Sequence, residues 1–391
     1  MKLSNICEAI VDCPHSTAKD EGKGYPLIRT PNVGKGRLKL DGVHRVSEKV
    51  YNQRNERAVP QTDDLILARE APVGNVAIIR QGQQVCLGQR TVLIRPNKEY
   101  VDPDFLVYYL LSPELQHKLL SSSNGATVNH LNMSSIRSLE VQVPDIEVQK
   151  RIGAILARID DKIELNTAIN EHLEQQAQAL FKAWFVDFEP FGGVMPDDWQ
   201  DISVYDLADY INGAAFKKAE YGDYGLPIIK IAELKSGITD STQYCCVRKD
   251  DKYYIDDRDI LFSWSGNPDT SIDTFLWSRG RAILNQHTFR VESKYNAPAF
   301  TYFLLKYLKP QFAHIASNKQ TTGLGHVTVA DLKRLQFCSN IATINEFEVL
   351  AAPIFNAIFA IYKENQHLAD LRDTLLPKLM NGEIDVSAVK I

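Results

Sequence analysis

The chain contains one unit twice. Residues 125–131 read GATVNHL and residues 321–327 read TTGLGHV, which places His130 and His326 196 positions apart. The other matches in register are YPLIR (25–29) with LPIIK (226–230), LGQRT (87–91) with LNQHT (284–288), and PDF (103–105) with PAF (298–300). A repeat of this length is far longer than a solenoid period. A duplicated module whose polar residues differ between copies suggests a protein that reads a two-part target.

Each copy ends in a segment with the pattern of a long helix. Residues 148–185 contain no proline and a single glycine, Gly153, and their apolar positions step by fours and threes. This seam comprises Ile152, Leu156, Ile159, Ile163, Asn166, Asn170, Leu173, Ala177, Leu180 and Trp184. A shift of 195 gives Phe347, Ala351, Ile354, Ile358, Ile361, Asn365, Leu368, Arg372, Leu375 and Leu379. Such seams are typical of coiled coils, in which a buried asparagine fixes register.

We expect the two helices to pair with each other as an antiparallel coiled coil. A helix of about 38 residues spans roughly 57 Å, so the pair would form a rod with a domain at each end, related by a pseudo-two-fold axis. The alternative is two ordinary amphipathic helices, each packed on its own domain. The predicted fold class is α+β, with two similar domains of mixed sheet and short helices. The predicted boundaries are 1–145 (first domain), 146–188 (first helix), 189–343 (second domain) and 344–391 (second helix).

Composition limits the classes of protein. The apolar content of 44% and charged content of 24% are ordinary for a globular protein. We expect a cytoplasmic chain without a membrane span or signal peptide, whose six cysteines are reduced thiols. The net charge of −5 is unusual for a nucleic-acid binder. Residues 23–57 nevertheless hold nine basic and three acidic residues, which provides a local basic surface.

The sequence contains no convincing catalytic or metal-binding motif. The Gly34-Lys35-Gly36 run lacks the upstream glycine and the Ser/Thr of a phosphate-binding loop. Residues 267–270 (NPDT) only faintly match the motif of amino-methyltransferases, because the second proline and the aromatic residue are missing. We therefore predict that the chain is not an enzyme by itself, and that it binds no metal and no cofactor.

The polar loop residues instead favour DNA recognition. Arginine and lysine read guanine, asparagine and glutamine read adenine, and serine and threonine are less selective. In the first copy the candidate DNA-binding residues are His15, Ser16, Thr17, Lys19, Arg29, Thr30, Asn32, Lys35, Arg37, Arg69, Glu70, Asn75, Gln89, Arg90, Asn124, Thr127, Asn129 and His130. In the second copy they are Lys217, Lys218, Lys230, Glu233, Lys235, Trp264, Ser265, Asn267, Gln286, His287, Asn318, Lys319, Gln320, Thr321 and Thr322. Gln89 and Gln286 are shared between copies, which also fits a structural role.

The order of domain and helix resembles that of the specificity subunit of type I restriction-modification systems. The resemblance rests on PDIEVQKRI at 144–152 leading into the first helix, LFKAWFVDF at 180–188 ending it, and LLPKLMNGEI at 375–384 ending the second. VDCPHST at 11–17 is similar to the opening of a first recognition domain in that family. Residues 340–347 depart from the pattern, since no proline-rich stretch precedes the second helix, and Asp145 replaces a common second proline.

The resemblance implies that each domain reads one part of a bipartite, asymmetric sequence in double-stranded DNA. It also implies two methylation subunits that carry S-adenosylmethionine and methylate adenine at N6. Motor-nuclease subunits that use ATP and Mg²⁺ would complete the restriction complex. Two alternatives stay open. The chain could be a scaffold whose end domains bind other proteins, or a decoy specificity chain. Polar loops rich in Arg, Lys, Asn and Thr favour DNA over a protein partner, which would need apolar anchors.

Overall fold

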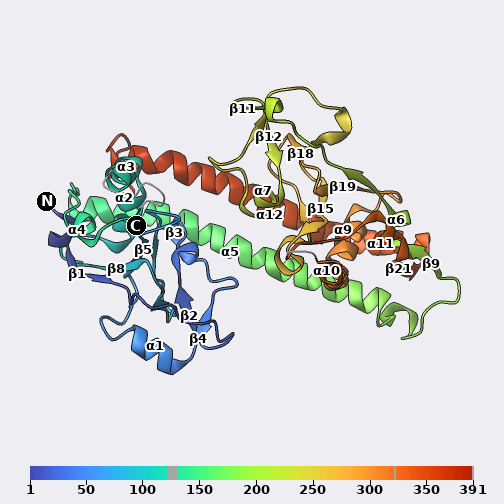
Figure 1. Ribbon diagram of the computed structural model, residues 1–391, viewed down its shortest axis with the longest axis horizontal. Helices are drawn as coiled ribbons and strands as arrows, with labels where there is room; N and C mark the ends of the chain where they lie inside the picture. The colour runs from blue at the N-terminus through green and yellow to red at the C-terminus, as the bar shows by residue number, and fades with distance from the viewer. Residues whose placement is uncertain (122–129, 321–322, 390–391) are drawn as a thin grey trace. The chain divides into compact units, whose positions relative to one another are not determined.

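The computed structural model describes residues 1–121, 130–320 and 323–389, and the chain forms two compact units (Figure 1). Unit 1 comprises Met1–Glu164 and His367–Ile391, and unit 2 comprises Leu165–Gln366. Two helices contribute to both units: α5 (Ile146–Phe185) and α12 (Ile341–Met380). Helix α12 begins three residues before the predicted position 344, because Asn340 Oδ1 accepts a hydrogen bond from the Thr343 amide at 2.7 Å and caps it.

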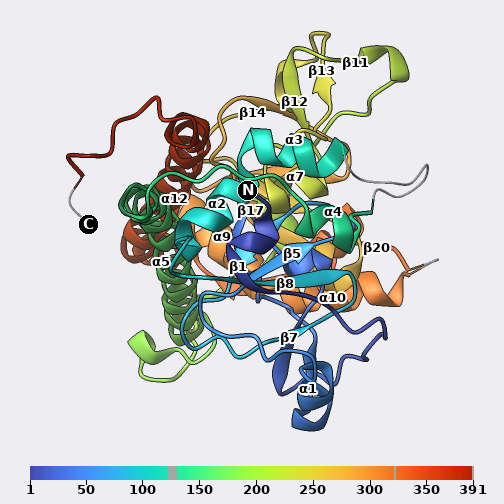
Figure 2. The same cartoon turned by 90° about the vertical axis from the view of Figure 1, so that its left-hand side faces the viewer.

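Unit 1 is built on a five-stranded mixed sheet in the order β1-β8-β5-β6-β3. Its strands are β1 (Cys7–Asp12), β8 (Thr91–Pro96), β5 (Leu65–Ala68), β6 (Val76–Ile78) and β3 (Gly36–Arg37). A smaller sheet contains β4 (Arg45–Val46), β2 (Tyr25–Ile28) and β7 (Cys86–Leu87). Its helices, besides the part of α5 and α12, are α1 (Glu48–Arg54), α2 (Pro103–Leu111), α3 (Pro113–Ser121) and α4 (Met133–Arg137). Figure 2 shows β1, β8 and β5 beside one another, and the core between them and α2 includes Leu65, Val92 and Phe105.

Unit 2 repeats this plan. Its main sheet has the order β10-β19-β15-β17, with β10 (Ala208–Asn212), β19 (Thr288–Ser293), β15 (Ile260–Ser263) and β17 (Asp273–Leu276). A second sheet contains β11 (Tyr221–Gly222), β13 (Tyr244–Cys245), β12 (Leu226–Ile229), β18 (Ala282–Leu284) and β14 (Tyr254–Ile255). Two short pairs join β16 (Ser265–Gly266) to β20 (Gly325–His326) and β21 (Gln336–Ser339) to β9 (Gln200–Ser203). The helices are α6 (Val204–Leu207), α7 (Ile231–Ser236), α8 (Pro268–Ser271), α9 (Pro298–Tyr307), α10 (Lys309–Asn318) and α11 (Val329–Arg334).

The strand registers confirm the duplication. Strand β1 pairs antiparallel with β8 so that Asp12 lies opposite Val92, and β10 pairs antiparallel with β19 so that Asn212 lies opposite Phe289. In both units the second sheet is built around a parallel pair, with Leu27 opposite Cys86 in one and Ile228 opposite Ile283 in the other. Corresponding backbone positions can therefore be compared residue by residue.

Within each unit α5 and α12 run antiparallel. In unit 2, Asn170 Nδ2 donates to the Ile358 carbonyl at 3.3 Å and Asn166 Nδ2 donates to Asn365 Oδ1 at 2.8 Å, so partner numbers fall as α5 numbers rise. Both α5 asparagines are buried, as the predicted seam requires. Polar pairing at this depth fixes register, because a slipped helix would leave the amides without partners.

Among the described residues, α12 is the one helix long and apolar enough to cross a membrane by length and composition, with a mean hydropathy of 1.4 in its most apolar window. One such helix is weak evidence for a membrane span. The core helix of a globular domain passes the same test. Ile344, Phe347, Ala351 and Ile358 are buried in the unit 2 core, where Phe347 contacts Phe181, Phe185 and Phe300.

Candidate nucleic-acid interface

Three strand ends meet at one edge of the unit 1 sheet. Because β8 is antiparallel to both β1 and β5, its first residue lies beside the last residues of those strands. Asp12 ends β1, Arg69 follows β5, and Arg90 precedes β8. The backbone of this edge is fixed by a hydrogen bond from the Arg69 amide to the Arg90 carbonyl at 2.8 Å. The sheet thus brings together residues that are far apart in sequence.

Arg69 is the anchor of this edge. Its Nη1 donates to Asp12 Oδ1 at 2.7 Å, its Nε donates to the Leu131 carbonyl at 2.8 Å, and its Nη2 lies 2.8 Å from His130 Nε2. Only 8% of its side chain is exposed. A guanidinium that is buried with its donors engaged holds neighbouring groups in place. Arg69 therefore organises the edge and has little capacity for an external ligand.

Glu70 links this anchor to the surface. Its Oε1 lies 3.1 Å from His130 Nδ1, and its Oε2 lies 2.8 Å from Arg90 Nη1. The Glu70 side chain is 16% exposed, whereas that of Arg90 is 62% exposed. Thr30, Glu70, Ala71, Arg90 and His130 line a hollow of about 440 Å³. Arg90 is therefore the exposed end of a chain of contacts that begins at a buried arginine.

A second hollow of about 210 Å³ adjoins the first, and Thr30 and Arg90 line both. Arg29 and Thr17 also line it, together with Gln89, whose Nε2 donates to the His15 carbonyl at 2.7 Å. Arg54 also lines it, and donates from Nε to the Leu87 carbonyl at 2.6 Å and from Nη1 to the Ser16 carbonyl at 3.0 Å. Burial lowers the pKa of Arg54, as removal of its charge from water requires.

Several predicted residues of the first copy lie away from these hollows. Arg37 is buried and its Nη2 donates to Asp161 Oδ1 on α5 at 2.6 Å. Asn32 is also buried, and accepts a hydrogen bond from the Arg29 amide at 3.2 Å. Lys35 and Asn75 line a separate hollow beside α2 and α12, and Asn75 donates to the Val33 carbonyl at 2.9 Å. The remaining predictions are the exposed Lys19, Ser16 and His15, which surround a hollow next to α1, and Asn124, Thr127 and Asn129, which fall outside the described residues.

Unit 2 has a corresponding edge with different side chains. Trp264 follows β15, His287 precedes β19, and the Trp264 amide donates to the His287 carbonyl at 3.4 Å. The Trp264 indole Nε1 donates to Asn212 Oδ1 at 3.1 Å, at the position where Arg69 binds Asp12 in unit 1. The Trp264 and His287 rings lie 5.7 Å apart. Ser265, the counterpart of Glu70, pairs with His326 in β16 and β20.

The other predicted residues of the second copy are more dispersed. Lys230 contacts Gln243 Oε1 and the Tyr221 ring, and Glu233 is buried and accepts from the Lys230 amide at 3.0 Å. Asn267 caps α8, and Lys319 pairs with Asp331. The exposed members are Lys217, Lys218, Lys235, Gln286, Asn318 and Gln320, while Thr321 and Thr322 lie outside the described residues. Trp264, Ser265 and His287 are the predicted residues that this edge brings together.

Sequence reasoning missed Asp12, Arg54, Asn212 and His326 as parts of these edges. Asp12 and Asn212 end equivalent strands, and that alignment in the repeat was the available signal. His326 was visible as the counterpart of His130. For Arg54 nothing in the sequence separates it from neighbouring surface arginines. In the part of the chain that the structure describes, no three His, Cys, Asp or Glu residues form a cluster suited to a metal ion.

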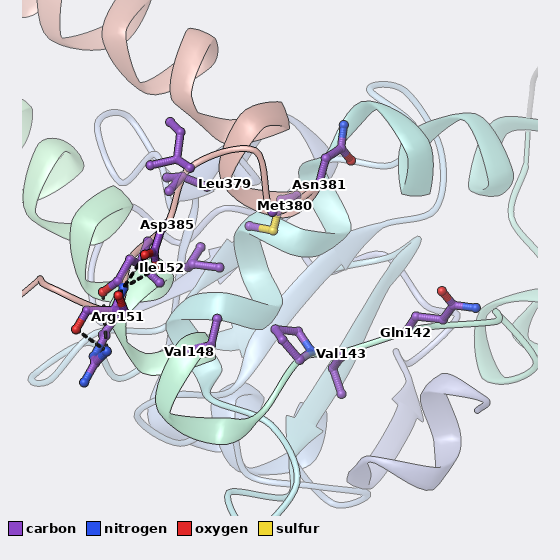
Figure 3. Close-up of a pocket in the computed structure, with 14 residues that line it drawn as sticks. Gln142, Val143, Val148, Arg151, Ile152, Leu379, Met380, Asn381 and Asp385 are labelled. Atoms are coloured by element: carbon purple, nitrogen blue, oxygen red, sulfur yellow. Dashed lines mark hydrogen bonds between the residues drawn. The ribbon is translucent and has the colours of Figure 1, made fainter.

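A further groove lies elsewhere in unit 1, where the beginning of α5 meets the end of α12 and the C-terminal tail. Figure 3 shows its lining, which includes Val148, Ile152 and Leu379, and the groove measures about 620 Å³. At this groove Arg151 Nη1 donates to the Ser387 carbonyl at 2.7 Å. In unit 2 the corresponding positions carry Phe347 and Trp184, whose rings pack 5.9 Å apart. Larger side chains fill the site there. None of the predicted DNA-contacting residues lines this groove.

Comparison with known proteins agrees with this architecture. The family model described as the type I restriction modification DNA specificity domain matches residues 1–175 and again residues 196–338. The MjaIX specificity subunit of Methanocaldococcus jannaschii is 27% identical over 367 residues, covering 88% of this chain and 83% of that protein. The HindI specificity subunit of Haemophilus influenzae is 27% identical over 375 residues, with 75% and 80% coverage.

The fold is shared with a solved structure, a type I restriction-modification S subunit from M. genitalium, with a TM-score of 0.55, 15% identity and coverage of 97% and 95%. A duplicated α+β module with two long helices, matched twice by one family model, defines the class. The chain belongs to the type I restriction-modification DNA specificity family. This result favours DNA recognition over the scaffold alternative.

Proposed function

We propose that this chain directs a type I restriction-modification enzyme to a bipartite, asymmetric DNA sequence, with each unit reading one half. One observation carries the proposal: the two units expose different side chains at the same backbone position, Arg90 in one and His287 in the other. Matched frameworks with different polar residues are suited to two different sequences. Contacts with base edges determine which DNA sequence is bound, whereas contacts with phosphates set the position of the protein on the duplex.

In this proposal the chain selects the DNA sequence, and its partner subunits carry out the reactions. Two methylation subunits carry S-adenosylmethionine and methylate adenine at N6, after the base has been flipped out of the duplex. Motor-nuclease subunits that use ATP and Mg²⁺ join for restriction. The net charge of −5 fits this division, because a chain that neutralised every phosphate contact alone would be basic. The complex would act in the cytoplasm, where the DNA that it modifies is located.

The test is co-expression with a candidate methylation subunit, followed by sequencing that maps N6-methyladenine. We expect a bipartite motif with a fixed gap that appears only when this chain is present. The methylation subunit expressed alone is the control. Formation of a stable complex without new methylation would contradict the proposal and would favour the decoy alternative.

The length of α5 and α12 is the feature that we propose to set the gap between the half-sites. Removing four residues from each helix shortens each by roughly 6 Å, about two base pairs at 3.4 Å per step. The expected result is a changed gap with unchanged half-site sequences in the methylation map. Alanine replacements at exposed positions of the same helices are the control and keep the original gap. Retention of that gap after the deletion would exclude a spacer role for the helices.

A further inference from the structure

The two units share a pair of backbone hydrogen bonds at one surface position but carry different side chains there. The Arg69 amide donates to the Arg90 carbonyl at 2.8 Å, and the Leu131 amide donates to the Arg69 carbonyl at 3.0 Å. In unit 2 the matching hydrogen bonds run from Trp264 to the His287 carbonyl at 3.4 Å and from the Val327 amide to the Trp264 carbonyl at 2.8 Å. Arg90 and His287 therefore occupy equivalent positions in the repeated fold.

At this position Glu70 orients the side chain of Arg90. Glu70 Oε2 accepts from Arg90 Nη1 at 2.8 Å, and its other oxygen is occupied by His130, which in turn contacts Arg69. Glu70 is thereby fixed from the protein side and directs Arg90. The residue at the same backbone position in unit 2 is Ser265, which cannot form an ion pair. The orienting arrangement thus belongs to unit 1.

Two further properties mark Arg90 as a contact residue. Its side chain is 62% exposed, although its Nη1 is held by Glu70. Its backbone has φ 65°, in the left-handed region that is uncommon for residues other than glycine. Non-glycine residues in this region are found at functional sites more often than elsewhere, since the surrounding structure must hold them there. The surface hollow of Thr30, Glu70 and His130 provides the space in front of it.

We propose that Arg90, oriented by Glu70, reads a guanine in the half-site of unit 1. The inference rests on the proposed function and adds the base that this position recognises. A guanidinium has five donors in a planar fork, and Glu70 engages one terminal nitrogen. The rest of the fork can present two parallel donors to O6 and N7 of guanine in the major groove, which is the commonest specific contact of arginine. His287 offers no such fork, so the half-site of unit 2 does not share this contact.

The competing possibility is that Arg90 binds a backbone phosphate. Phosphate contacts carry no sequence information, so loss of one weakens binding to all sequences alike. A contact with a base edge instead changes which base is accepted at one position. The two possibilities therefore differ in the methylation motif and not merely in the amount of methylation.

The experiment compares the N6-methyladenine motifs of the complete complex carrying wild-type chain, Arg90→Ala, Arg90→Lys, Glu70→Gln or Arg158→Ala. We expect Arg90→Ala to relax one guanine position in one half-site, with discrimination falling by roughly 5- to 150-fold, as one bidentate contact provides. Arg90→Lys keeps the charge and loses the fork, so the same position should relax. Glu70→Gln should relax that position to a smaller extent. Arg158→Ala, an exposed arginine of α5, is the matched control and keeps the motif.

The outcomes distinguish a failure of the proposed function from a failure of the proposed guanine contact. Absence of any wild-type methylation contradicts the proposed function itself. A wild-type motif that Arg90→Ala and Arg90→Lys leave unchanged, including a uniform fall in methylation at all sites, overturns guanine reading and supports a phosphate contact. If Arg90→Ala gives no methylation, Arg90→Lys decides: an unchanged motif overturns the inference, and a relaxed guanine position supports it.

Discussion

Replacing Arg372 with leucine is expected to lower the free energy of unfolding of unit 1 by about 3–5 kcal/mol, the usual result of breaking a buried ion pair from one side. Arg372 Nη1 donates to Asp160 Oδ1 at 2.7 Å, and Asp160 is 3% exposed. Without Arg372 the carboxylate keeps the Tyr108 hydroxyl, which donates to its other oxygen at 2.6 Å, but loses its direct ion-pair partner on α12. Burial and the neighbouring carboxylate raise the pKa of Tyr108, so this hydroxyl remains a neutral donor.

The measurement is urea unfolding of the full chain, monitored by circular dichroism. The double variant Asp160→Asn with Arg372→Leu removes both charges, so it should recover most of the lost stability. Arg158→Leu removes an exposed arginine and should change stability by less than about 0.5 kcal/mol. A loss below about 1 kcal/mol for Arg372→Leu alone would mean that water reaches Asp160 and solvates it.

Replacing Phe181 with alanine is expected to destabilise unit 2 by about 3–5 kcal/mol, because it deletes a ring from a closely packed core. Phe181 on α5 is fully buried. Its ring centroid lies 5.0 Å from that of Tyr307, 5.7 Å from that of Phe347 and 6.1 Å from that of Phe300. The side chain thus joins α5, α9 and α12, and a cavity there would loosen all three.

Thermal unfolding monitored by near-ultraviolet circular dichroism tests this expectation, since the lost signal comes from packed aromatic rings. Val349→Ala on α12 is the control, because Val349 is 74% exposed and its truncation leaves no cavity. An effect of Phe181→Ala no larger than that of Val349→Ala would show that neighbouring rings collapse into the space. Methylation of the unit 2 half-site should fall in parallel with stability.

The sequence was most informative where periodicity decides structure. The alternation of fours and threes predicted two long helices, and the observed α5 and α12 carry Asn166 and Asn170 in their buried interface. The repeat also predicted that the two domains share a framework, which the equal registers of β1 with β8 and β10 with β19 confirm. These features depend on spacing along the chain, and spacing is what a sequence records directly.

Side-chain placement at the candidate interface was less predictable. Arg37 and Arg90 both lie in segments that contain glycine and polar residues, yet Arg37 is buried against α5 and Arg90 is exposed. Residue type alone cannot tell which face of a two-residue strand points inward. The contact of Arg69 with Asp12 was equally hidden, because 57 residues separate the two and only sheet order brings them together.

The anchoring of the first domain to α5 limits how freely that domain can be replaced. Arg37 and Tyr108 belong to the domain, whereas Asp160 and Asp161 belong to the helix that would be retained in an exchange. A donor domain without an equivalent hydroxyl and cation would leave the buried Asp160 with Arg372 as its ion-pair partner but without the Tyr108 hydroxyl, and would leave the 60% exposed Asp161 to solvent. Natural shuffling of target specificity in such chains should therefore give the more stable proteins when the donor domain already carries this pair.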